Sequence, residues 1–178
     1  MKKAFSTKKI ILGGLFVALA YILPYLTGNL GALGQMISPM HLPILLCGFV
    51  CGGPVALITG LVSPILRSAL VGMPPMFPTA IAMAFELAAY GFFAGFFYNK
   101  LAKKTLNIYI SLILSMLCGR VVWGVVSFIL YGIQGTPFTL SIFFTGAFVK
   151  AVPAIILQIV IIPLIVIALK RAKILKED

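Results

Sequence analysis

Acidic residues are almost missing from this chain: there are three among 178 residues, and only Glu86 lies away from the C-terminal end. There is one histidine, His41, and three cysteines, Cys47, Cys51 and Cys118. The cysteines lack the further ligands or partners that a zinc site or a disulfide framework needs. With so few carboxylates and imidazoles, an acid/base pair for catalysis is hard to assemble. We therefore expect no metal site, no resident cofactor and no enzymatic activity.

Nucleotide-binding and hydrolytic motifs are missing as well. The chain has no GxxxxGK[ST] loop, no HExxH and no GxSxG, so ATP hydrolysis, zinc proteolysis and serine hydrolysis lack their usual motifs.

The formal net charge of +11 is compatible with a nucleic-acid partner, but most basic residues lie in three short clusters that flank apolar segments. These clusters are Lys2, Lys3, Lys8 and Lys9; Lys100, Lys103 and Lys104; and Lys170, Arg171 and Lys173. Such clusters orient helices in membranes, so we expect no nucleic-acid partner.

Apolar residues make up 62% of the sequence, against 10% charged residues. One core cannot hide that much apolar surface, so the surplus must face lipid. Runs close to the bilayer-spanning length, separated by Gly, Pro or Lys, predict an all-α integral membrane protein with six transmembrane helices in a single domain over residues 1–178. The expected spans are 9–26, 41–58, 60–72, 79–99, 107–131 and 141–169. The third is short and contains Pro64 and Arg67, which favours a broken or tilted helix. The first could imitate a signal peptide, but no convincing cleavage site follows it.

The distribution of positive charge predicts the orientation in the cell membrane. Both termini and the loop around residues 100–104 carry lysines, which places them in the cytoplasm, and six spans satisfy this arrangement. The loops at 27–40, 73–78 and 132–140 carry no charge and are expected outside. They are rich in glycine and proline, the residues of special backbone conformations.

Four charged residues remain inside the expected spans: Arg67, Glu86, Arg120 and Lys150. By the helical rise, Arg67 and Glu86 lie about 7 to 10 Å from the outer helix ends, and Arg120 and Lys150 about 13 to 17 Å. All four could converge in the outer half of the bundle. Three cations against one carboxylate leave an excess positive charge that an anionic ligand would complete. In the alternative, Arg67 pairs with Glu86, while Arg120 and Lys150 snorkel or bond backbone carbonyls.

Aromatic and polar residues near this level suit a small-molecule pocket. Trp123 follows Arg120 by three residues and is expected to pack against the ligand. Tyr90 lies one turn after Glu86 and could bond that carboxylate, bond the ligand or pack in the core. His41, at the outer end of the second span, could contact ligand or serve as a helix-entry group.

The first span carries a small-xxx-small pair, Gly14 and Ala18. Small residues at this spacing form a flat face that another helix can approach closely. The pair becomes informative if the protein has a membrane partner.

The stretch from Met40 to Tyr98 contains three motifs. They are PILLCGFVCGGPVALITGLVSPIL from Pro43, GMPP from Gly72, and ELAAYGFFAGFFY from Glu86. These resemble the substrate-binding S components of energy-coupling factor (ECF) vitamin transporters. The size, six spans and cytoplasmic termini agree with that family over the whole chain, and the motif-level similarity covers mainly this stretch and the first helix.

The resemblance implies a high-affinity vitamin-binding subunit that captures its solute from outside and provides specificity. Its implied partners are a transmembrane coupling protein and two cytoplasmic ATPases, which provide the energy. S components contact the coupling protein through an AxxxA motif on the first helix, which here reads Gly14 to Ala18, with Gly in place of the first Ala. The GMPP loop and the following helix look most like the pantothenate-type branch, and the pantothenate carboxylate suits the excess of cations.

Two other functions are compatible with a bare membrane-protein sequence. An autonomous ion-coupled secondary transporter of a small anionic solute would need an ion site and often shows inverted repeats, which are not obvious here. A small membrane enzyme or assembly factor acting on lipid is the other, and no motif supports it.

Overall fold

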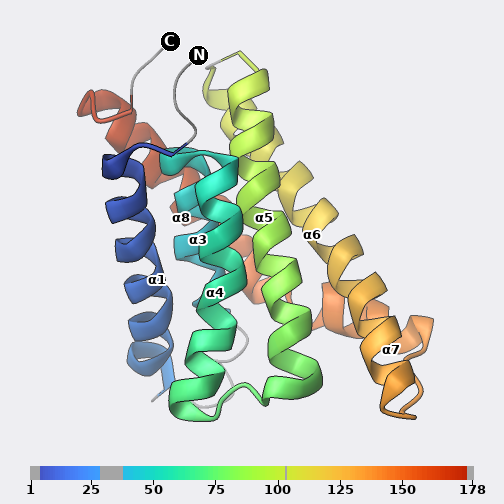
Figure 1. Cartoon of the computed structure of the whole chain (residues 1–178). Coiled ribbons are helices and arrows are strands. Elements are labelled where there is room, and N and C mark those ends of the chain that lie inside the picture. Colours follow the sequence, from blue (N-terminus) through green and yellow to red (C-terminus); the bar gives the residue numbers. More distant parts are fainter. Residues whose placement is uncertain (1–4, 29–37, 103, 176–178) are drawn as a thin grey trace.

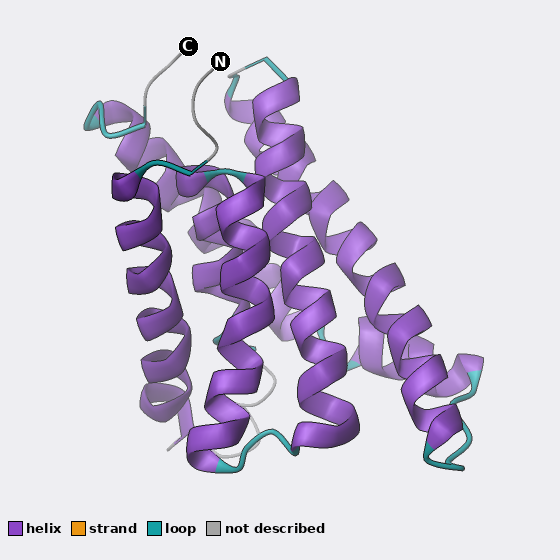
Figure 2. Ribbon diagram, viewed as in Figure 1, coloured by secondary structure: helices purple, strands orange, loops and turns teal. Residues whose placement is uncertain are grey.

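The computed structural model describes residues 5–28, 38–102 and 104–175, and within these ranges the chain is helical with no strand (Figure 2). The long helices are α1 (Thr7–Gly28), α4 (Gly53–Val71), α5 (Ile81–Lys100), α6 (Thr105–Ile133) and α8 (Val152–Arg171). The shorter ones are α3 (His41–Cys51), η1 (Met76–Ala80), α7 (Leu140–Phe144) and η2 (Thr145–Val149). The prediction of an all-α membrane protein is confirmed at this level.

The helix α5 lies at the centre of the bundle and contacts α3, α4 and α6, while α1 packs on α3 and α4. The start of α1, the end of α8 and the α5–α6 connection lie at one end of the bundle (Figure 1). The α4–η1 connection and the α6–α7 turn lie at the opposite end. This arrangement agrees with the predicted grouping of these loops, whereas the predicted loop at 27–40 lies mostly outside the described residues. The assignment of one end to the cytoplasm stays a prediction.

Five helical stretches are long and apolar enough to cross a bilayer: Thr7–Thr27, Gly53–Val71, Met76–Lys100, Thr105–Ile133 and Leu140–Arg171. The remaining predicted span corresponds to α3, whose 11 residues extend only about 16 Å at the helical rise. The sixth crossing therefore stays a prediction.

The boundary between the second and third predicted spans was wrong. The chain breaks at Gly52, with φ 90° and ψ 165°, and not near residue 59. Such a φ is open to glycine at little cost, so α3 is short and α4 is long, the reverse of the prediction. Of the two alternatives for the third span, broken or tilted, the break was also wrong: α4 continues through Pro64 to Val71, and Gly72, with φ 73°, caps it.

Glycines bring the backbones of α3, α4 and α5 together. A Cβ at Gly60 of α4 would lie 2.5 Å from backbone atoms of α5, and one at Gly91 of α5 would lie 2.7 Å from the Ala56 carbonyl oxygen. Gly95 lies directly against the backbone of the α3–α4 junction. Close approach of this kind lets helices in a membrane associate by van der Waals contact, without a hydrophobic driving force between them.

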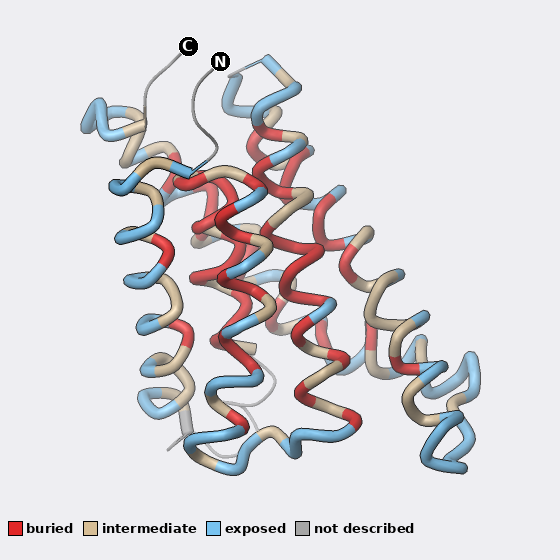
Figure 3. Tube along the Cα trace, viewed as in Figure 1, coloured by how far each residue is buried: buried red, intermediate tan, exposed pale blue. Residues whose placement is uncertain are grey.

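The second half of the chain is less buried than this glycine-packed unit. Buried residues concentrate in α3, α4, α5 and one face of α6, whereas α7 has none (Figure 3). Figure 1 shows α6 diverging from α5 toward the end that carries α7. The seam between α6 and the α7–η2–α8 stretch is therefore where space for a ligand is to be sought.

Candidate functional site

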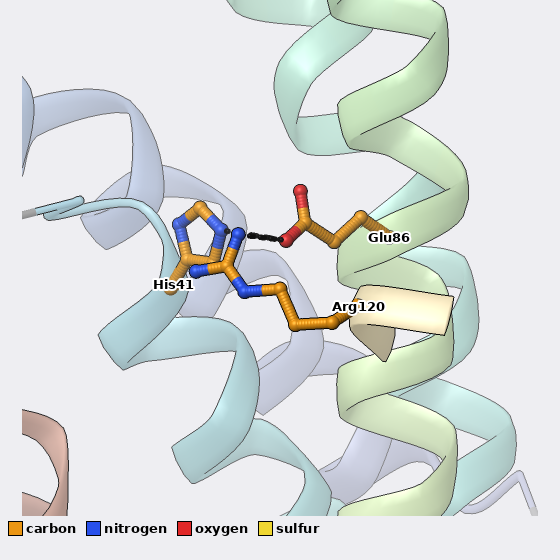
Figure 4. A network of polar contacts seen from close by, with 3 residues as sticks. All are labelled: His41, Glu86 and Arg120. Atoms are coloured by element: carbon orange, nitrogen blue, oxygen red, sulfur yellow. Dashed lines mark ion pairs between the residues drawn. The ribbon is translucent and has the colours of Figure 1, made fainter. Parts of the chain in front are cut away.

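Glu86 is held between two other helices. Its side chain is 3% exposed, and its Oε1 lies 2.9 Å from Nη1 of Arg120 on α6 and 3.7 Å from Nε2 of His41 at the start of α3 (Figure 4). The arginine contact is a close ion pair, and the histidine contact is too long for a hydrogen bond. Of the three cations expected inside the spans, Arg120 is thus the partner of Glu86.

Tyr90 completes this buried cluster. Its ring lies 5.5 Å from the His41 ring and 5.9 Å from the Arg120 guanidinium carbon. Gly119 of α6 makes room for it, because a Cβ there would overlap the Tyr90 ring. Within the described residues, Tyr90 Oη, both His41 ring nitrogens and Arg120 Nε are buried without a hydrogen-bond partner. The cluster thus retains hydrogen-bonding capacity beyond the ion pair.

Arg67 does not belong to this cluster. Its Nη1 donates a hydrogen bond to the Tyr21 carbonyl oxygen of α1 at 3.1 Å, and its guanidinium carbon lies 4.9 Å over the Tyr25 ring. The four charged residues therefore do not converge, and the alternative in which Arg67 pairs with Glu86 is wrong, because Arg120 occupies that carboxylate. Counting residues along a helix does not give the direction in which the side chain of Arg67 points, and the predicted depths stay predictions.

Replacing Arg67 by Leu should loosen α1 without weakening ligand binding. The change removes a hydrogen bond from a charged donor and a cation–π contact, together worth about 2 kcal/mol, so the melting temperature should fall by about 4–8 °C. Thermal unfolding and equilibrium binding on the same detergent sample measure both properties. Tyr25→Leu is the companion variant: it keeps the Arg67 hydrogen bond to the Tyr21 carbonyl and loses the contacts of the Tyr25 side chain with Arg67 and Tyr21. A large loss of affinity at an unchanged melting temperature would return Arg67 to the binding site.

A cavity of about 430 Å³ lies between the α7 end of α6 and the α7–η2 stretch, and we name it the outer cavity because it is nearer the end of the bundle that is expected to face outside. Its walls include the predicted residues Trp123 and Lys150, together with Phe138, Ser141 and Thr145. The volume falls within the usual range of small-molecule sites, about 300–1,000 Å³. The cavity combines aromatic walls, hydroxyl groups and one cation, a combination that suits a small polar anion.

An inner cavity of about 210 Å³ lies further along the seam, between α6 and α8. Apolar side chains line it, among them Met116, Phe148, Ile155 and Ile159, and Arg120 is its one charged wall. Since Arg120 is paired with Glu86, this cavity presents apolar surface and a neutralised guanidinium.

An aromatic row links the two cavities. The Trp123 ring stacks on Phe143 at 6.1 Å, and Phe143 meets Phe148 edge-on at 6.3 Å. Trp123 lines the outer cavity and Phe148 lines the inner one. Gly146 faces Trp123, since a Cβ there would lie 2.9 Å from Cη2 of the indole.

Sequence reasoning missed most of the outer wall. Phe138 and Ser141 were assigned to the last outer loop and the start of the last span, and Thr145 was treated as part of an apolar helix. The available signal was the cluster of hydroxyl residues at Thr136, Thr139, Ser141 and Thr145, which is unusual for a lipid-facing helix start.

Gly14 and Ala18 lie on an exposed face of α1. Among the described residues, no side chain or backbone atom of another element lies within 4 Å of a Cβ placed at Gly14, whereas the neighbouring Gly13 packs against Val55. The small-xxx-small face is thus turned away from the bundle.

Several apolar spans, buried charges and two cavities within one helical seam define a multi-pass membrane protein that binds a small molecule. The family model for the substrate-specific component of ECF transporters matches residues 8–166, and the chain belongs to that family. Its members are substrate-binding subunits of transporters and not enzymes, and they work with the components of an ECF module. No curated protein and no solved structure matches the chain.

Proposed function

We propose that this chain is the vitamin-capture subunit of an ATP-driven ECF uptake transporter and that its solute is an anionic vitamin, with pantothenate favoured. The observation that carries the proposal is the position of Lys150 in the outer cavity beside Trp123. Glu86, the one carboxylate within the described residues, is taken by Arg120. The Lys150 ammonium is therefore open to an anionic group of the solute.

In this proposal, different residues that line the outer cavity bind different parts of the solute. Lys150 pairs with the anionic group, Ser141 and Thr145 hydrogen-bond its polar atoms, and the Trp123 face packs against its apolar part. The loop from Gly72 to Pro78 closes over the bound solute, and reorientation of the subunit on the coupling protein releases it inward. The first outer loop, which was also expected to cover the solute, lies mostly outside the described residues. The partner ATPases provide the energy.

A thermal-shift screen of the purified protein against the B vitamins and their phosphates tests this function. A ligand at about 100 times its dissociation constant stabilises the fold by about 2.7 kcal/mol. A shift with pantothenate names the solute, and a shift with another anionic vitamin retains the function with a different solute. Uptake by vesicles that contain this chain alone, driven by a proton or sodium gradient, would favour the secondary-transporter alternative.

Replacing Lys150 by Gln should weaken pantothenate binding by about tenfold or more, because a charge-assisted hydrogen bond contributes about 1.5–3 kcal/mol. Isothermal titration measures the affinity, and Lys104→Gln, at the opposite end of α6, serves as the matched control that keeps wild-type affinity. Equal affinities in wild type and Lys150→Gln would remove the lysine from the site.

The exposed face of α1 is proposed as the surface that contacts the coupling protein. Replacing Gly14 or Ala18 by Leu fills this face, so complex formation with a reconstituted ECF module should be lost while vitamin affinity stays unchanged. Ala168→Leu, an equal substitution at an exposed position on α8, is expected to leave the complex intact. Intact co-purification of both α1 variants would place the interface elsewhere.

A further inference from the structure

Each of the two cavities along the seam between α6 and the α7–η2–α8 stretch has one cationic wall. Lys150 belongs to the outer cavity and Arg120 to the inner one. Arg120 and Trp123 are three residues apart on α6, about 4.5 Å along the helix axis, so the two cavities lie close enough for one small ligand to enter both. The net charge along the seam then decides which ligands the site accepts.

Glu86 removes one of these two charges. Its Oε1 lies 2.9 Å from Arg120 Nη1, and both side chains are shielded, with 3% and 11% of their surface exposed. In so little water a free guanidinium would attract an anion strongly, whereas a paired one leaves neighbouring space suited to uncharged groups. The other walls of the inner cavity are apolar side chains, in agreement with this interpretation.

We propose that Glu86 restricts the ligand to a single negative charge. Because Glu86 neutralises Arg120, Lys150 alone binds the anionic group of the ligand, and the inner cavity accepts only an uncharged, apolar part of the ligand. This inference rests on the proposed function and names the substrate class of the same site. In it, Glu86 is a specificity-determining residue that acts through Arg120 without touching the ligand.

The remaining groups around Glu86 keep this charge balance. Tyr90, one turn further on α5, presents a neutral hydroxyl, and α3 contributes His41 at 3.7 Å. Binding of every variant is measured at one pH, so that the other groups around Glu86 do not differ between the variants. Under that condition the pair of Glu86 and Arg120 sets the difference in charge between the variants.

Three related probes read the two ends of the ligand separately. Pantothenate carries one carboxylate, pantothenol replaces that carboxylate by an alcohol, and 4′-phosphopantothenate adds a phosphate at the far end of the arm. Wild type should prefer pantothenate over both of the others by about tenfold or more, the size of one charge-assisted contact. In Glu86→Gln the freed Arg120 should attract the phosphate, and the preference for pantothenate over 4′-phosphopantothenate should fall by about tenfold.

The double variant Glu86→Gln, Arg120→Gln separates the two possible roles of Arg120. Its inner cavity carries no net charge, as in wild type, so its pantothenate affinity should lie within about threefold of the wild-type affinity. Such a change is well below the effect of losing a charged contact. If Arg120 itself binds the carboxylate, the double variant loses affinity and the inference is overturned.

Ile159→Phe, which fills the inner cavity, should lower the affinity for pantothenate by about tenfold. Unchanged affinity would show that pantothenate does not enter this space and would also overturn the inference.

The vitamin screen gives a readout that needs no variant. If the wild-type protein binds a neutral, cationic or dianionic vitamin, the proposed restriction to one negative charge is overturned, while the proposed capture of a vitamin stands. If the protein binds none of the vitamins, both the proposed function and the proposed restriction to one negative charge are overturned. A sole preference for monoanionic vitamins supports both.

Discussion

A methyl group added at both Gly60 and Gly95 is expected to prevent assembly of the helix bundle. At Gly60 the new Cβ would lie 2.5 Å from backbone atoms of Leu87 and Ala88, and at Gly95 it would overlap the backbone of the α3–α4 junction. Backbone atoms cannot rotate away as side chains do, so each helix pair must separate. Overpacking of this kind costs about 1–3 kcal/mol per site, and the two sites together should cost about 5 kcal/mol.

Size-exclusion chromatography and thermal unfolding of Gly60→Ala, Gly95→Ala and the double variant measure this effect. Each single variant should melt lower than wild type, and the double variant should fail to give a monodisperse protein. Gly132→Ala is the matched control, since nothing lies within 4 Å of a Cβ at that position and alanine favours the helix by about 1 kcal/mol. A double variant as stable as the control would mean that the helices do not approach as closely as the structure has them.

The helix bounds were predictable wherever the length of an apolar run alone determines them. Four of the expected spans agree with described helical stretches to within a few residues, because a lipid-facing helix needs an uninterrupted apolar run. The α3–α4 boundary was not predictable in this way. Gly52 and Gly53 lie inside one apolar run, and hydropathy does not register that Gly52 adopts a positive φ.

The binding seam was predictable in composition but not in geometry. Counting residues from the helix ends predicted depths for Arg67 and Arg120, and depth does not specify the direction of a side chain. Arg67 points to the Tyr21 carbonyl on α1, and Arg120 points to Glu86. Phe143 and Thr145 were missed for a related reason, because η2 interrupts the regular helix between α7 and α8 and alters which residues share a face.

Removing the positive charge of Arg120 should destabilise the protein strongly. Arg120→Met keeps most of the side-chain volume but leaves the Glu86 carboxylate, 3% exposed, without its cation. Breaking a buried ion pair from one side costs about 3–5 kcal/mol, which corresponds to a melting temperature lower by about 10 °C. Thermal unfolding of the detergent-purified variant measures this loss.

The second half of this cycle tests whether the destabilisation comes from the uncompensated charge. Glu86→Gln together with Arg120→Met removes both charges, so most of the lost stability should return, because a buried pair replaced by neutral groups is often neutral for stability. A double variant that loses the sum of the two single effects would show that Glu86 and Arg120 stabilise the bundle independently. Recovery in the double variant would instead show that α5 and α6 are held by mutual neutralisation, the pairing on which the proposed role of Lys150 in anion binding rests.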